Sequence, residues 1–170
     1  MNRQSVPYTH DLAKVLGLLQ KPGLLLASTK PDGTSNTMTI GWGYVGFSWG
    51  KPIWVVMVRP SRYTYEFIEA SQSFTVNVPT PEMTQWVGVC GTQSGRDLDK
   101  FGEYGMTVTP GQTVEAVTID ACPMVYECKV VHHNDVLPAN LDVGLEQRSY
   151  GGADYHRYYY GEISGVYAAS

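Results

Sequence analysis

A chain of 170 residues with a formal charge of −4 has no basic surface of the kind that neutralises a phosphate backbone, which argues against nucleic acid as a partner. No apolar run approaches the roughly 20 residues that a membrane-spanning helix needs, and the N-terminus has no signal-peptide pattern. Glycine and aromatic residues are frequent, and the charged fraction of 16% is low, a composition that favours a sheet-rich fold. The low charge also favours a homo-oligomer, in which a partner subunit covers part of the surface.

The cysteines indicate a reducing compartment. Cys90, Cys122 and Cys128 are odd in number and match neither a zinc site nor a disulfide framework. Free thiols are typical of proteins inside the cell, so we expect a soluble, cytoplasmic protein.

The N-terminal part of the chain predicts one helix and one hairpin. Apolar residues recur at helical spacing over residues 10–20, and Pro22-Gly23 ends that helix. An apolar run over residues 23–28 then leads to Pro31-Asp32-Gly33, whose chemistry presets a tight turn, and an extended run continues through Ile40.

Two further strands are expected next. Trp42, Tyr44, Phe47 and Trp49 stand among glycines, and a β-branched run covers residues 53–58. We expect the turn between these strands at Lys51-Pro52.

The centre of the chain predicts two helices around a strand. Ser61 is expected to cap a short helix over residues 63–69. Alternation over residues 73–78 predicts a half-buried strand, and residues 82–89 predict a second helix.

The C-terminal part predicts three more strands, over residues 113–119, 124–131 and 158–167. Residues 132–152 form a long loop with one short helix. Strands outnumber helices without βαβ alternation, so the sequence predicts a mainly β protein, an antiparallel barrel with appended helices.

Two segments carry groups that suit a phosphorylated ligand. Residues 36–42 offer hydroxyls, and residues 59–64 offer guanidinium groups with a helix N-terminus at Ser61. Backbone N–H groups and arginine forks both bind phosphate. The residues alone leave a second interpretation open, in which Thr37 and Thr39 face solvent and Arg59 lies on a rim.

An ordered set of sequence blocks resembles the flavin reductase-like family, the FMN-binding split barrels that include flavoredoxin. The blocks are Asn36-Thr37-Met38-Thr39, residues 42–52, residues 59–66, residues 74–79, Ser94-Gly95-Arg96-Asp97 with residues 99–101, and residues 159–163. Each block is weak by itself, but together they follow the family's order and spacing over most of the chain.

The resemblance implies a fold and a cofactor. The fold would be a six-stranded antiparallel split β-barrel that occupies residues 1–170 as one domain. FMN would bind non-covalently near the interface of a homodimer, with one side of its ring open. The cofactor-binding residues that the resemblance implies are Asn36, Thr37, Met38, Thr39, Trp42, Arg59, Ser61, Tyr63, Thr64, Ser94, Gly95 and Lys100.

These residues would have different roles. Thr37, Met38 and Thr39 would contact the ring or the ribityl chain. The phosphate contacts would come from Arg59, Ser61, Tyr63 and Thr64, and the far side would be closed by Ser94, Gly95 and Lys100.

The resemblance implies that the protein is an FMN-binding oxidoreductase, and the leading hypothesis is an NAD(P)H-dependent flavin reductase. Placement of the nicotinamide against the flavin would do most of the catalysis, so no protein residue is assigned as catalytic. The alternatives are an electron carrier of the flavoredoxin type with a redox protein partner, and a module that holds FMN or haem without turnover. The chain has no Gly-x-Gly-x-x-Gly nicotinamide motif.

Three other features are interpreted as structural. Cys90 is taken as a small buried hydrophobe rather than a redox thiol. No metal site is expected at His132-His133, because neighbours on a strand point to opposite faces. His156 lies in a tyrosine-rich segment typical of an interface or a final strand, and a place near the flavin stays open for it.

Overall fold

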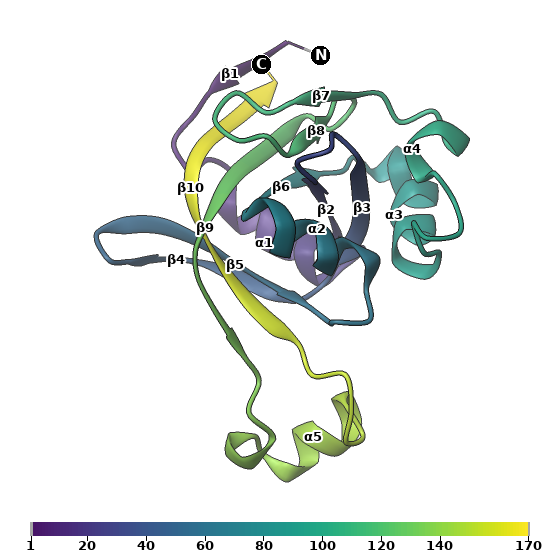
Figure 1. The fold of residues 1–170 in the computed structure, drawn as a ribbon. Helices are drawn as coiled ribbons and strands as arrows, with labels where there is room; N and C mark the ends of the chain where they lie inside the picture. Colours follow the sequence, from purple (N-terminus) through teal and green to yellow (C-terminus); the bar gives the residue numbers. More distant parts are fainter. Residues whose placement is uncertain (1, 170) are drawn as a thin grey trace.

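The extended runs of the sequence form one strongly curved antiparallel sheet in the computed structural model, which describes residues 2–169 (Figure 1). Seven of its eight strands have the order β3-β2-β6-β9-β10-β5-β4, and the eighth, β1, pairs with the C-terminal end of β10. The strands are β1 (Arg3–Ser5), β2 (Leu24–Thr29), β3 (Ser35–Ile40), β4 (Gly43–Ser48), β5 (Lys51–Val58), β6 (Ser73–Val78), β9 (Met124–Asp135) and β10 (Arg157–Ala169). A separate two-stranded ribbon pairs β7 (Val108–Pro110) with β8 (Val117–Ile119).

The mainly β antiparallel class with appended helices is confirmed, but the expected number of six strands is wrong. The additional members include β1, which has only three residues and therefore shows no readable alternation. The strand expected over residues 113–119 is confined to β8, and β7 was missed. Strands this short are specified by their pairing partner rather than by their own pattern.

The helices lie around the curved sheet, except α5, which lies away from it (Figure 1). They are α1 (Leu12–Gln20), α2 (Tyr63–Ser71), α3 (Thr84–Thr92), α4 (Lys100–Glu103) and α5 (Val143–Ser149), with 3₁₀ turns at Pro81–Met83 and Pro138–Asn140. The helix predictions for the regions of α1, α2 and α3 are confirmed, and α5 is the short helix expected in the long loop. The one-turn α4 was not predicted, because four residues show no helical period.

The core has two parts on opposite sides of β2. Leu24 and Leu26 pack among the large buried side chains inside the barrel, which include Trp54, Phe74 and Tyr126. Leu25 points the other way and packs with side chains of α3. Both faces of β2 are therefore covered, and β6, which was expected to be half-buried, is buried along its whole length for the same reason.

The turn between β4 and β5 differs from the expectation. It lies at Trp49-Gly50, which both have positive φ, at 54° and 73°. Ser48 pairs with Lys51 and Phe47 with Pro52, so Lys51-Pro52 begins β5. Positive φ at two central residues gives the hairpin turn whose twist matches the strands, and this decided the position of the turn.

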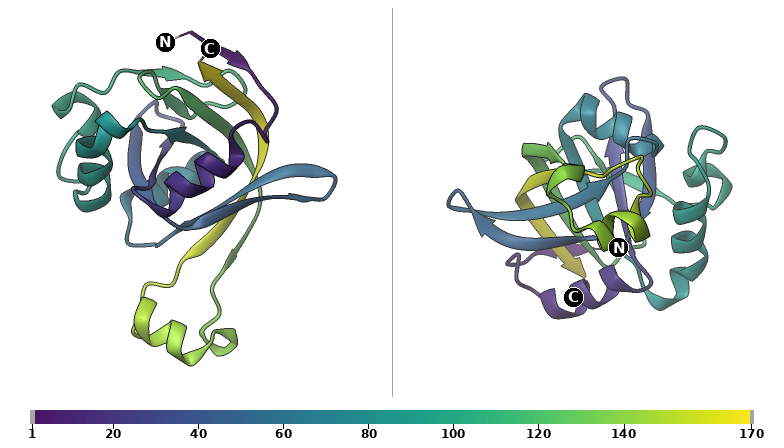
Figure 2. Two further views of the ribbon diagram at one scale, coloured as in Figure 1. Left: turned by 180° about the vertical axis from the view of Figure 1, so that it is seen from behind. Right: turned by 90° about the horizontal axis from the view of Figure 1, so that it is seen from below.

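A long extension carries α5 away from the barrel. The paired strands β9 and β10 run past the sheet and end in residues 136–156, here called the arm (Figures 1 and 2). Residues 132–135, expected to be loop, belong to β9. Within residues 2–169, every helix is too short or too polar to cross a membrane.

Candidate functional site

A cavity of about 320 Å³ opens between β3, the start of α2 and the end of α3. The end of β5 and the arm's His156 complete its wall. The lining residues are Asn36, Met38, Thr39, Ile40, Gly41, Trp42, Met57, Arg59, Ser61, Arg62, Tyr63, Thr64, Cys90, Gly91, Thr92, Gln93, Ser94, Gly95, Lys100 and His156.

The structure brings the residues expected at the site together around this cavity, with the single exception of Thr37. The Thr37 hydroxyl points into the fold, where it donates a hydrogen bond to the Leu26 carbonyl at 3.1 Å. Thr37 reaches the site only through its backbone oxygen, which accepts a hydrogen bond from Lys100 Nζ at 2.6 Å. Thr39 lies on the same face of β3 and still lines the cavity, so the alternation of the strand alone does not exclude Thr37, and its hydrogen bond to Leu26 keeps the hydroxyl out of the site.

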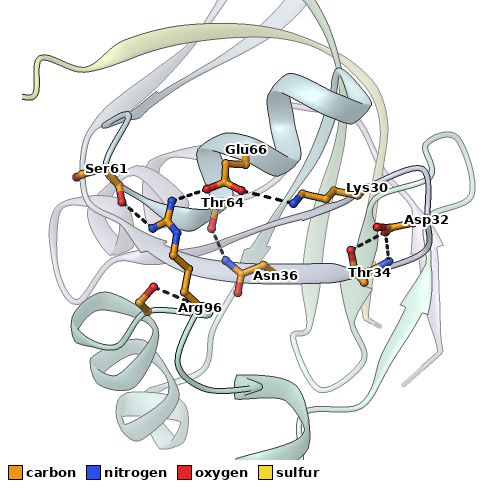
Figure 3. A network of polar contacts seen from close by, with 9 residues as sticks. Lys30, Asp32, Thr34, Asn36, Ser61, Thr64, Glu66 and Arg96 are labelled. Atoms are coloured by element: carbon orange, nitrogen blue, oxygen red, sulfur yellow. Dashed lines mark hydrogen bonds and ion pairs between the residues drawn. The ribbon is translucent and has the colours of Figure 1, made fainter.

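Hydrogen bonds to α2 and α3 hold the β3 side of the cavity. Asn36 Nδ2 donates to Thr64 Oγ1 at 2.9 Å, which ties β3 to the first turn of α2 (Figure 3). Thr39 Oγ1 donates to the Val87 carbonyl at 2.6 Å and so ties β3 to α3. Gly95 lies directly on Asn36, because a Cβ at that position would overlap the Asn36 amide. We call β3 with these partners the sheet wall.

Lys100 places a buried amine at the sheet wall. It is only 3% exposed, and burial lowers the pKa of its ammonium group. Cys90 lies nearby, and burial raises the pKa of its thiol while Lys100 acts weakly in the other direction. A thiol with a raised pKa stays protonated at neutral pH, which agrees with the interpretation of Cys90 as a small hydrophobe.

Ser61 does not cap α2 as expected. The capping position is Arg62, whose side chain makes no capping bond, and the Ser61 hydroxyl points instead toward the arm. The start of α2 is held from outside by Arg96, which donates to the Ser61 carbonyl at 3.1 Å and pairs with Glu66 (Figure 3). The guanidinium of Arg96 also lies 4.8 Å from the centre of the Tyr63 ring.

The arm supplies the opposite side of the cavity. Arg59 Nη2 donates to the Ser149 carbonyl at 2.6 Å, and Ser61 Oγ donates to Asp154 Oδ2 at 2.6 Å. His156 follows two residues later and lines the cavity. We call Arg59, Ser61 and these arm residues the arm wall.

His156 is buried beside aromatic rings. Its Nδ1 lies 2.9 Å from the Tyr150 hydroxyl, and its ring centre is 5.0 Å from that of Trp42. Burial, assisted by the charge of Arg59, lowers the pKa of His156 to about 4. The imidazole is therefore neutral at physiological pH, and it contributes a polar but uncharged edge to the cavity.

The sequence prediction missed part of the lining. Met57, Arg62 and residues 90–93 at the end of α3 were not among the site residues. The signal for Arg62 was present in the block over residues 59–66, whereas residues 90–93 reach the site because α3 packs on β3. His132 and His133 lie on β9, with ring contacts to Tyr160 and Tyr159 respectively.

Comparison with known protein families identifies the domain. The model of the "Flavin reductase like domain" matches residues 17–170, which include every element of the cavity. The chain belongs to the flavin reductase-like family. The family resemblance of the sequence blocks is thus confirmed, and the curved sheet is the split barrel of this flavin reductase-like domain.

Individual relatives agree with the family. An uncharacterized protein of Archaeoglobus fulgidus is 32% identical over 109 residues, which cover 64% of this chain and 61% of the relative. The chain spans less than two thirds of the length of the curated relatives it matches.

Two solved flavoredoxin structures are similar along most of the chain. The flavoredoxin of Desulfovibrio vulgaris is 25% identical with a TM-score of 0.70, and the alignment covers 88% of this chain and 70% of that one. The flavoredoxin of Methanosarcina acetivorans is 28% identical with a TM-score of 0.69, covering 87% of this chain and 69% of that one.

The arrangement suits an elongated ligand with a flat part and an anionic end. The sheet wall offers backbone and small side chains along β3, while arginine side chains gather where β5 runs into α2. Ser61 offers its backbone N–H and its hydroxyl as donors beside the Arg59 guanidinium, a combination found in sites that recognise phosphate.

Proposed function

We propose that this chain binds FMN non-covalently in the cavity and acts as an NAD(P)H-dependent flavin reductase. The observation that carries the proposal is that the residues expected to bind FMN, Thr37 apart, line one cavity of a flavin reductase-like domain. A volume of about 320 Å³ lies within the range of small-molecule sites. Bound FMN would supply the hydride and electron transfer.

The two walls would hold different parts of the cofactor. The flat ring would lie along β3, with Met38 and Thr39 at its face or ribityl chain and with Lys100 closing the far side. The phosphate would take donors from Arg59, Ser61, Tyr63 and Thr64, all of which line the cavity. The donor set fits the cofactor, because arginine forks and hydroxyls are the groups that bind phosphate.

The protein would act by placement. Holding a nicotinamide against the exposed ring face at near-attack distance accelerates transfer without a protein acid or base. The neutral His156 and the Trp42 ring stand at the edge of the cavity, where they would border that face. We therefore assign no residue as catalytic.

A second function is favoured by the two flavoredoxin structures. In this version FMN stays bound and exchanges electrons with a protein partner, and no nicotinamide site is needed. The two functions differ in the electron donor, which makes them separable by one experiment.

The experiment is an anaerobic absorbance spectrum of the purified protein loaded with FMN, recorded before and after adding NADH and then NADPH. Bleaching of the flavin bands by a nicotinamide supports the reductase. Bands that persist with both but bleach with dithionite support the electron carrier. Failure to take up FMN contradicts both proposals.

The phosphate contacts have their own test. Replacing Arg59 and Ser61 together by alanine should weaken FMN binding by roughly 3 kcal/mol or more, which is at least about a hundredfold, because each charge-assisted contact contributes about 1.5–3 kcal/mol. Riboflavin, which lacks the phosphate, should lose much less affinity in this variant than FMN does. Equal FMN affinity in the variant and the parent would show that the phosphate does not bind at Arg59 and Ser61.

We also propose that the protein is a homodimer. The hairpin of β4 and β5 exposes Phe47 at 65% and Trp49 at 63%, and Val143 on the arm is exposed at 69%. Exposed apolar side chains in this density usually mark an interface, and a second copy is the partner we expect. Phe47→Glu with Trp49→Glu should halve the mass measured by light scattering.

The cytoplasmic location that the free thiols favour stays a prediction.

A further inference from the structure

An internal carboxylate occupies the donors at one end of the cavity. Asp154 Oδ1 accepts the Ser61 backbone N–H at 3.1 Å, and Asp154 Oδ2 accepts the Ser61 hydroxyl at 2.6 Å. Arg59 Nη1 lies 3.9 Å from Oδ2. We call the Ser61 N–H, the Ser61 hydroxyl and the Arg59 guanidinium the Ser61 cradle. All three are groups that would equally well serve an oxygen of a phosphate.

The backbone around Asp154 is shaped for this contact. Asp154 has a φ of 53°, in the left-handed region that Asp tolerates better than most residues. Its own carbonyl accepts from Arg59 Nη1 at 3.3 Å, and Arg59 Nη2 binds the Ser149 carbonyl. Residues 149–154 of the arm therefore engage the cradle with the carboxylate and two carbonyls together.

We propose that Asp154 is an internal anion that competes with a ligand phosphate for the Ser61 cradle and so determines how strongly the site prefers a phosphorylated ligand. The proposal rests on the proposed function, because it concerns the phosphate of the same ligand. A carboxylate and a phosphate repel each other at contact distance and cannot share the same two Ser61 donors. A phosphate that binds the cradle must displace Asp154. Its apparent affinity is therefore the intrinsic affinity multiplied by the fraction of molecules in which the cradle is free.

Displacement of Asp154 would also affect the cavity wall, because Asp154 is close in the sequence to His156. His156 lies two residues after Asp154, and its carbonyl accepts the Val136 N–H at 3.0 Å, at the base of the arm. Release of residues 149–154 therefore loosens the segment that places His156 against Trp42. A phosphorylated ligand would change this wall, whereas the same ligand without phosphate would leave it in place.

The test compares FMN with riboflavin by the quenching of flavin fluorescence. Asp154→Asn keeps the size and the tolerance of left-handed backbone but removes the charge. It should raise FMN affinity about tenfold and leave riboflavin affinity within about twofold. Asp142→Asn is the matched control, because it removes the same charge from the same arm and Asn caps α5 as well as Asp does. This control should change neither affinity.

Hydrogen exchange gives a second measurement that needs no flavin. Inorganic phosphate, compared with chloride at equal ionic strength, should speed amide exchange over residues 149–156 in the parent protein and leave Asp154→Asn unaffected. If both flavins bind but the FMN affinity of Asp154→Asn is equal to or lower than that of the parent, the proposed competition is wrong. If neither flavin binds but phosphate still opens residues 149–156, the competition stands and the proposed function fails. No effect of phosphate on exchange overturns the competition directly.

Discussion

The two walls of the cavity are held by different parts of the molecule. On the sheet wall, Asn36, Thr39 and Lys100 make hydrogen bonds to groups of the core. On the arm wall, Arg59 and Ser61 are held by one loop of an extension that projects from the barrel. The sheet wall is therefore as stable as the fold, whereas the arm wall can change without unfolding it.

The largest effect is expected at the arm wall, from His156→Gln. Burial lowers the folded-state pKa of His156 from 6.5 to about 4, so the unfolded chain takes up a proton between these values that the folded chain does not. The unfolding free energy of the parent should therefore fall with pH from 6.5 to 4, by an amount on the order of 3 kcal/mol.

The measurement is urea unfolding at several pH values across this window. His156→Gln should lose this part of the pH dependence, while the control His10→Gln, at an exposed position, should keep it. An equal pH dependence in the parent and in His156→Gln would mean that the arm wall opens before His156 titrates.

Lys100→Met tests whether the sheet wall separates binding from stability. Burial already disfavours the charged amine, but an apolar side chain of similar length leaves the Thr37 carbonyl without its donor, so the two effects oppose each other and the unfolding free energy should change by less than about 1 kcal/mol. FMN affinity should fall by about 1.5–3 kcal/mol if the ammonium contacts the cofactor. Titration with FMN and urea unfolding measure the two effects, and the exposed Lys129→Met is the control. A parallel loss of stability and affinity would contradict the assignment.

Thr39→Val removes the hydrogen bond between β3 and α3. The substitution keeps the shape but leaves the Val87 carbonyl without its hydroxyl donor, which should cost about 1 kcal/mol of unfolding free energy. The exposed Thr107→Val should cost much less. A cost as small as that of the control would show that α3 is held to the sheet by apolar packing alone.

The smallest effect is expected where the arm leaves the barrel. Arg157 forms a two-pronged contact with Asp135 at 2.6 and 2.9 Å, which lowers the pKa of Asp135. Because Asp135 is half exposed, Asp135→Asn should cost below about 1 kcal/mol at neutral pH, and the cost should shrink as salt is added. A larger loss of unfolding free energy, or one that does not depend on salt, would show that the contact of Asp135 with Arg157 is buried like those of the core.

Sequence reasoning reached further on the sheet wall than on the arm wall. The hairpin of β2 and β3 was predicted because Pro31-Asp32-Gly33 sets the turn locally, and Asn36, Met38 and Thr39 follow from the strand that it starts. The contact of the Thr37 side chain was not foreseen, since its hydroxyl bonds to the Leu26 carbonyl and this bond depends on the pairing of β2 with β3. Asp154 was missed altogether, because its partners Arg59 and Ser61 are more than 90 residues away.

What the sequence by itself determined is the set of local signals: a mainly β chain, the helices with clear apolar spacing, and the blocks that match the flavin reductase-like family. Only the tertiary structure decided that β9 and β10 continue into an arm, that Ser61 binds Asp154 instead of capping α2, and that His156 is buried against Trp42. Turns and periodic elements depend on neighbouring residues, whereas contacts between distant segments depend on the register of the whole sheet.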